Sequence, residues 1–449
     1  MQTQDCRGVP LSGGNRAAAA RLERATELLA RFDLDPLAEV DALLAEEPGL
    51  VMGHCLRAAL MLLSTDKACE GELAASLAAA EALAPRANDR ERGHMAALRA
   101  WLAGGMRRAG DLYGRVLLDH PRDLLALQLA HQCDFFTGRS SMLRDRVAWV
   151  LPHWGSGTPG FGFVLGMHAF GLEETNLYAR AEEQGRRALS LDARDPWAIH
   201  AVAHVMEMEG RAEEGIAWLA GRQADWAGGN MLAFHNWWHL ALFHMDRGEH
   251  ARVLELYDAG VRPDGAGPVP MEMLDASALL WRLHLRGVAV GDRWARLADG
   301  WAAVEPGHYA FNDAHAVLAL TAAGRPAEAE AVAGALRRAA GAAAGDNARM
   351  SRAVGLPLAE AVMAFGRGDY AAATATLLGL RERAHLFGGS HAQRDVIHQT
   401  LAEAALRAGD GALAAALAAE RLDLKPRSPF NALLARRADA LRGASAAAA

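Results

Sequence analysis

Pairs of histidines at helical spacing are the most distinctive chemical pattern in this chain of 449 residues. His200 and His204 are four residues apart, and so are His235 and His239. Because four residues make slightly more than one helical turn, each pair projects from one face of a helix. Imidazole changes its charge near neutral pH and binds transition metals in its neutral form. Such faces therefore suit acid–base chemistry, ligand binding or metal binding.

A second pattern lies near the C-terminus, where Asp395 follows His391 by one turn and precedes His398 by three residues. A carboxylate beside an imidazole can orient it as a proton acceptor, so we predict His391, Asp395 and His398 as catalytic residues. Ser390 is placed to cap the helix that begins here, and Arg394 lies one turn further on. Together they would hold an anionic group at the helix N-terminus.

Further polar residues fall on helices that we expect to face one shared interior. Ionisable groups gathered in one interior are costly to bury unless they are paired, and such gatherings often mark functional pockets. The alternative is that His–Asp pairs only satisfy a polar core. The remaining predicted ligand-binding residues are His168, His200, His204, Glu207, His235, Asn236, Trp238, His239, Asp275, Asn312, Asp313 and His315.

Metal binding is a weaker expectation from the sequence. There is no HExxH motif, and none of the four cysteines has CxxC spacing. We therefore predict no cofactor and no metal. An alternative mixed site of nitrogen and oxygen ligands would use His200, His204, Glu207, His235 and His239.

Turn residues recur along the chain at a period of about 34 to 42 residues, the length of a tetratricopeptide-like helix pair. The first helices of successive pairs are predicted to begin near Phe161, Trp197, Met231, Met271, His308, Arg349 and His391. A single helix pair cannot bury its apolar face alone, so stacking must supply the core. The sequence predicts an all-α solenoid of stacked helix hairpins. Its predicted parts are N-terminal repeats over 1–150, C-terminal repeats with the histidine-rich pocket over 151–442, and a disordered tail over 443–449.

The composition is that of a globular protein, with 51% apolar and 22% charged residues. The net charge of −7 gives no reason to expect nucleic acid or an anionic membrane as a partner. No apolar run is long enough to cross a bilayer, and no secretory signal is visible near the N-terminus. These features predict a cytoplasmic protein.

Several long blocks of sequence resemble one known family. They are GVPLS from Gly8, VMGHCLRAALMLL from Val51, HAVAHVMEMEGRAEEGIAWL from His200, HNWWHLALFHMD from His235, DASALLWRLHLRG from Asp275, YAFNDAHA from Tyr309 and GGSHAQRDVIHQTL from Gly388. This set is similar to the tetratricopeptide repeat protein 38 family. The resemblance implies an α-solenoid in a soluble protein, and it implies no particular reaction.

Two functions remain open on the sequence. The first is a pocket that binds a small polar or anionic molecule, with acid–base chemistry of the hydrolase or lyase type as a possible extension. The alternative is a scaffold that binds a peptide or protein partner on its concave face, as helical repeats commonly do. Neither function calls for nucleic acid or a membrane, and the oligomeric state stays open.

Overall fold

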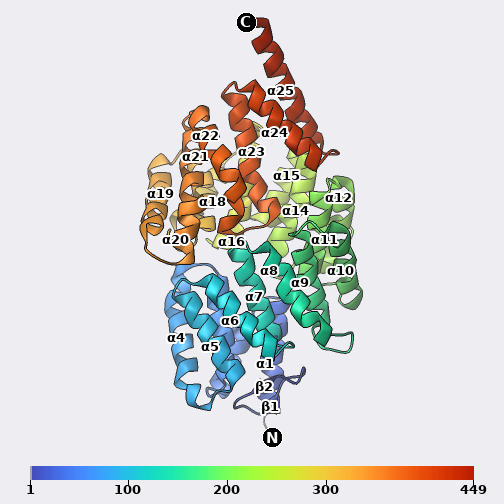
Figure 1. The fold of residues 1–449 in the computed structure, drawn as a ribbon, viewed down its shortest axis with the longest axis vertical. Helices are drawn as coiled ribbons and strands as arrows, with labels where there is room; N and C mark the ends of the chain where they lie inside the picture. Colours follow the sequence, from blue (N-terminus) through green and yellow to red (C-terminus); the bar gives the residue numbers. More distant parts are fainter. Residues whose placement is uncertain (1–2, 449) are drawn as a thin grey trace. The chain divides into compact units, whose positions relative to one another are not determined.

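The computed structural model of the chain describes residues 3–448, with side chains through residue 444. The predicted fold class is confirmed, because within these residues the chain is a succession of tetratricopeptide-like α-helical hairpins (Figure 1). The β-structure of the described part is one antiparallel pair, β1 (Thr3–Gln4) with β2 (Pro10–Leu11), and a single isolated bridge. Among the helices of residues 3–448, none has both the length and the hydropathy to cross a bilayer.

The chain forms two compact units, which we call unit 1 and unit 2. Unit 1 contains Met1–Val202 and Ala224–Ala233, and unit 2 contains Ala203–Gln223 and Phe234–Ala449. The two units therefore divide within helix α11 (Pro196–Met208) rather than at residue 150. The predicted boundary at residue 150 separates two groups of repeats. It remains a prediction, and it is a different boundary from the one between these two units.

Unit 1 is built from short helices that pair in order along the chain, such as α5 with α6 and α9 with α10. Its helices are α1 (Arg16–Ala30), α2 (Pro36–Glu46), α3 (Val51–Leu63), α4 (Glu70–Ala82), α5 (Asp89–Leu102), α6 (Met106–Asp119), α7 (Leu124–Phe136), α8 (Ser140–Val150), α9 (Phe161–Glu173), α10 (Tyr178–Leu191) and the first part of α11. Short 3₁₀ turns occur at Lys67–Cys69, Ala84–Arg86 and Leu151–His153.

Unit 2 continues the same pattern from the second part of α11. Its helices are α12 (Ala212–Ala220), α14 (Ala233–Asp246), α15 (His250–Leu256), α16 (Pro270–Leu285), α17 (Arg293–Ala302), α18 (Ala310–Ala322), α19 (Pro326–Gly341), α20 (Asp346–Met350), α21 (Leu356–Gly366), α22 (Tyr370–Leu380), α23 (His391–Arg407), α24 (Gly411–Leu424) and α25 (Pro429–Ala448). The short helix α13 (Gln223–Trp226) lies at the division of the units, two π-helical turns are Tyr257–Val261 and Ser351–Gly355, and a 3₁₀ segment is Arg381–Phe387.

The hairpin turns follow from Gly-Asp steps in the sequence. Gly409 has a φ of 79°, the left-handed conformation that glycine adopts without strain, and it ends α23. The next residue, Asp410, accepts a hydrogen bond from the Leu413 amide at 3.0 Å and so caps α24. Gly368 and Asp369 repeat this arrangement between α21 and α22, with Asp369 accepting from the Ala372 amide.

The predicted first helices begin within a few residues of their expected positions and are buried on nearly every side. Helix α16, for example, buries an unbroken stretch from Met273 to Leu283 and packs against α18 and α23. A helix that is apolar all round belongs in a core. The polar residues that these helices do carry are therefore enclosed by other helices.

Residues 443–448, which the sequence predicts to be a disordered tail, continue helix α25. The alanines in this stretch have the highest helix propensity of any residue, which accounts for the continuation. Residue 449 lies outside the described residues.

Candidate functional site

The predicted His–Asp pairing occurs in unit 2 between two different helices. Nδ1 of His235 on α14 donates to Oδ2 of Asp275 on α16 at 2.5 Å. The other oxygen of Asp275 accepts from Nε2 of Gln393 on α23 at 3.1 Å. Gln393 is itself fixed, because it and Ser390 form a capping box at the start of α23. Three helices therefore hold one carboxylate that is only 1% exposed.

A second pair lies one turn along α14. Nδ1 of His239 donates to Oε2 of Glu207 on α11 at 2.9 Å. The rings of His204 and His235 lie 4.4 Å and 4.8 Å from that of His239, centroid to centroid. Burial holds the pKa of His239 well below its usual range, and the neighbouring histidines and cations add to this effect. Burial also raises the pKa of Glu207.

The Trp238 indole completes this group from α14. It stacks on the His235 ring with the centroids 5.2 Å apart and the planes 15° from parallel. Asn236 is buried on the same helix. The predicted ligand-binding residues His204, Glu207, His235, Trp238, His239 and Asp275 are thus close neighbours in unit 2.

Asp395 has a different partner from the one predicted. Its carboxylate accepts from Nη1 and Nη2 of Arg421 at 2.6 and 3.1 Å and from Nε2 of Gln399 at 2.6 Å. A bidentate guanidinium is a stronger partner than an imidazole on the same helix, so Asp395 turns toward Arg421 rather than orienting His391 or His398. Burial alone would raise the pKa of Asp395, but the Arg421 cation holds it well below its usual range. Burial lowers the pKa of His398.

The start of α23 is capped as the sequence predicts. The Ser390 hydroxyl accepts a hydrogen bond from the backbone amide of Gln393 at 3.2 Å. Arg394, which we expected to reach a ligand, hydrogen-bonds through Nη1 to the Gly389 carbonyl. Its guanidinium therefore braces the loop that precedes the helix.

Three of the other predicted residues lie on α18 of unit 2. On α18, both carboxylate oxygens of Asp313 accept from the Gly307 amide at 3.1 Å, and burial raises the pKa of Asp313 to about 7. His315 binds the Phe311 carbonyl at 2.7 Å, and Asn312 is buried beside them. His168 and His200 belong to unit 1.

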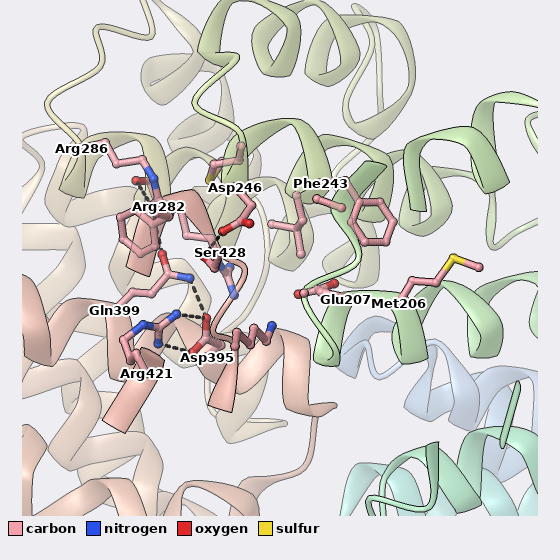
Figure 2. Close-up of a pocket in the computed structure, with 16 residues that line it drawn as sticks. Met206, Glu207, Phe243, Asp246, Arg282, Arg286, Asp395, Gln399, Arg421 and Ser428 are labelled. Atoms are coloured by element: carbon pink, nitrogen blue, oxygen red, sulfur yellow. Dashed lines mark hydrogen bonds and ion pairs between the residues drawn. The ribbon is translucent and has the colours of Figure 1, made fainter. Parts of the chain in front are cut away.

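Sequence reasoning missed a group of basic residues in unit 2. Arg282, Arg286, Arg421 and Lys425 line a pocket together with Glu207, Asp246, Asp395 and Gln399 (Figure 2). The pocket has a cavity volume of ≈ 50 Å³. That space holds a few water molecules or one small anionic group.

Arg282 and Arg286 are the most unusual members of this pocket. Nη1 and Nη2 of Arg282 donate to the carbonyls of Ala278 (3.1 Å) and Ala392 (2.6 Å). Nη1 of Arg286 donates to the Arg282 carbonyl and to Gln399, at 2.8 and 2.9 Å. Within the part of the chain that the structure describes, no carboxylate lies within ion-pairing distance of either guanidinium. Their spacing of four residues on one helix was the available sequence signal.

Burial makes these two cations costly to hold. It lowers the pKa of Arg282, and it lowers that of Arg286 to about 9, where the Arg282 and Arg421 cations contribute as well. The Arg286 guanidinium also sits over the Phe430 ring, 3.7 Å from its centroid. An anion in this pocket would therefore stabilise both arginines.

A wider pocket adjoins the first, with a volume of ≈ 500 Å³. The two share Met245, Asp246, Arg286 and Phe430. The wider pocket adds Arg247, His250, Glu403, Arg407, Leu433, Arg436 and Arg437 to the lining. We call the two pockets together the basic groove. Eight arginines and lysines line it against four carboxylates.

No family model matches this chain. Its fold is similar to a chain in the crystal structure of the APC/C hetero-tetramer Cut9-Hcn1, with 14% identity and a TM-score of 0.42 over 95% of this chain and 77% of that one. Human IFIT1, solved as a dimer with m7Gppp-AAAA, is similar with 14% identity and a TM-score of 0.40 over 96% of each chain. The P58(IPK) TPR domain gives 13% identity and a TM-score of 0.19 over 88% of this chain and 99% of that chain.

Proposed function

We propose that unit 2 binds an acidic segment of a partner protein in the basic groove. The observation that carries this proposal is the local charge. The groove presents eight cations and four carboxylates, whereas the whole chain has a net charge of −7. A basic groove on an acidic protein attracts acidic partners and repels basic ones.

The inner end of the groove fits one carboxylate group. Its volume of ≈ 50 Å³ is too small for a whole peptide, and Arg282 and Arg286 lie side by side there. A carboxylate placed between them would accept charge-assisted hydrogen bonds and offset the repulsion between the two cations. A glutamate or aspartate side chain, or a C-terminal carboxylate, would supply that group.

The outer end of the groove fits the rest of such a segment. Arg436 is exposed there, and Leu433 is 44% exposed beside it. The ion pair of Arg247 with Glu249 is partly exposed. An exposed ion pair contributes little to stability, so an acidic partner could replace this one at low cost.

This proposal develops the scaffold alternative rather than the small-molecule one. Acid–base catalysis by His391, Asp395 and His398 stays a prediction, as does membership of the tetratricopeptide repeat protein 38 family. A cytoplasmic location stays a prediction as well. The binding experiment distinguishes this proposal from binding of a free small anion in the inner pocket.

The experiment is fluorescence anisotropy of a labelled polyglutamate peptide with a free C-terminal carboxylate, titrated with the full chain. We expect saturable binding that weakens at high salt, because the attraction is electrostatic. Arg286→Gln should weaken binding by roughly tenfold or more, since a buried charge contact is lost. Arg337→Gln is the matched control, because Arg337 is 52% exposed and lies outside the groove.

Two outcomes contradict the proposal. One is equal peptide affinity for the wild type and Arg286→Gln when circular dichroism shows both folded. The other is equally tight binding of a polylysine peptide. If inorganic phosphate binds wild type but not Arg286→Gln while the peptide binds neither, the groove serves a small anion and the partner-protein proposal fails.

A further inference from the structure

We propose that His204, His235 and His239 form a binding site for a divalent transition metal ion, with zinc as the ion to test. Asp275 and Glu207 would hold two of the imidazoles from behind. The proposal concerns unit 2 alone and does not rest on peptide binding in the basic groove.

The three histidines converge in space although they come from two helices. One ring nitrogen from each lies within 4.8 Å of those of the other two, and all three residues are buried. Zinc binds an imidazole nitrogen at about 2.0–2.1 Å, so ligand nitrogens in a tetrahedral site lie about 3.4 Å apart. Modest rotations of the side chains would close the difference.

The tautomers of two rings are set by carboxylates that contact Nδ1. Nδ1 of His235 donates to Asp275, and Nδ1 of His239 donates to Glu207. A neutral imidazole with its proton on Nδ1 carries its lone pair on Nε2. Metal-binding histidines usually make this second contact, which fixes the ring and increases the basicity of the nitrogen that binds the ion.

The support behind His235 extends further than one residue. Asp275 is held by Gln393, and Gln393 is held by its capping box with Ser390. The Trp238 indole stacks on one face of the His235 ring. A ring fixed by a carboxylate on one edge and an indole on one face is preorganised for a ligand.

The kinds of donor atom restrict the ion. Three neutral nitrogens suit zinc, nickel, cobalt and copper, whereas calcium and magnesium need oxygen ligands. The local charges also suit a divalent cation, because Glu207 and Asp275 would compensate its two positive charges.

The experiment begins with full-length protein freed of metal by a chelator and then titrated with cobalt(II) and with zinc. We expect one ion per chain and, for cobalt, the intense visible bands of tetrahedral nitrogen coordination. His239→Ala should abolish both. Asp275→Asn leaves all three ligands in place and should weaken zinc binding by roughly 10- to 100-fold.

His153→Ala is the control, since His153 is exposed and is not part of the cluster. Wild-type protein that takes up no zinc, or His239→Ala that takes up as much as wild type, would overturn the proposal and leave the histidines as a polar core. Arg286→Gln should keep its zinc. Loss of peptide binding in that variant with zinc retained separates the two proposals.

Discussion

Buried charges are arranged differently in unit 1 and unit 2. In unit 1, Asp123 accepts from Nε of Arg90 at 2.6 Å and from Nε2 of His94 at 2.8 Å. Its other oxygen caps α7 by accepting from the Ala126 amide at 3.0 Å. In unit 2, Arg282 and Arg286 donate to carbonyl and amide oxygens, with no carboxylate partner among the described residues.

The difference separates a structural network from the proposed binding groove. Asp123 has a partner on each oxygen, and the Arg90 and His94 charges hold its pKa well below the usual range although burial opposes this. Such a network is complete without a ligand. Arg282 and Arg286 have no such carboxylate partner among the described residues, so an anion bound there would stabilise them. On this comparison, a buried charge without a charged partner is a better candidate for ligand binding than a buried charge that is already paired.

The largest expected effect compares one buried arginine from each unit. Arg90→Met removes the guanidinium that pairs with the buried Asp123, so we expect the unfolding free energy to fall by about 3–5 kcal/mol. Arg282→Met removes no carboxylate's partner, so its loss should be about 1 kcal/mol, for the hydrogen bonds to carbonyls. Urea unfolding followed by circular dichroism measures both.

Asp89→Ala is the control for these two variants, since the Asp89 side chain is 96% exposed and its ion pair with Arg92 should contribute about 0–1 kcal/mol. Equal losses for Arg90→Met and Arg282→Met would remove the distinction between the two units.

A smaller expected effect concerns the pH dependence of stability, and it tests a buried histidine of unit 1. Burial lowers the pKa of His131 to about 3. Its unfolded pKa is about 6.5, so the unfolded state binds the proton more readily, and stability falls as pH drops from 6.5 toward 3. His131→Leu removes this loss. Relative to wild type, it should retain about 2 kcal/mol more stability on going from pH 7 to pH 5.

The measurement is urea unfolding at several pH values. The control is His153→Leu, because His153 is exposed in the same unit. A pH dependence for His131→Leu that matches wild type would show that His131 takes up its proton as easily in the folded protein as in the unfolded chain.

The smallest expected effect compares a capping box from each unit. Asn88 caps α5 with Glu91, and Ser390 caps α23 with Gln393. Asn88→Ala and Ser390→Ala should each lower stability by about 1 kcal/mol. Only Ser390→Ala should also weaken zinc binding, because Gln393 supports Asp275. If Ser390→Ala lowers stability but leaves zinc affinity unchanged, the capping box supports the helix alone.

The fold could be predicted from the sequence because its determinants are local. A step such as Gly409-Asp410 ends one helix and caps the next, and its effect depends on few other residues. Repetition of such steps specifies the hairpins. The positions of the first helices could be predicted for the same reason.

The site could be predicted only in part because its pairings cross between helices. His235 and Asp275 were both expected at the site, but their hydrogen bond joins residues 40 positions apart. Asp395 was assigned to its sequence neighbours, whereas Arg421 comes from the following helix. Spacing along one helix shows which side chains share a face. It does not show which side chain from another helix will compete for them.

Glu207 belongs to both proposed sites, since its carboxylate accepts from His239 and it also lines the basic groove. Occupation of one site would therefore change the free energy of occupying the other. Thermodynamic linkage makes this change reciprocal: if metal alters peptide affinity by some factor, the peptide alters metal affinity by the same factor. The affinity for the partner protein would then depend on whether the metal ion is bound, and the affinity for the metal ion would depend on whether the partner is bound.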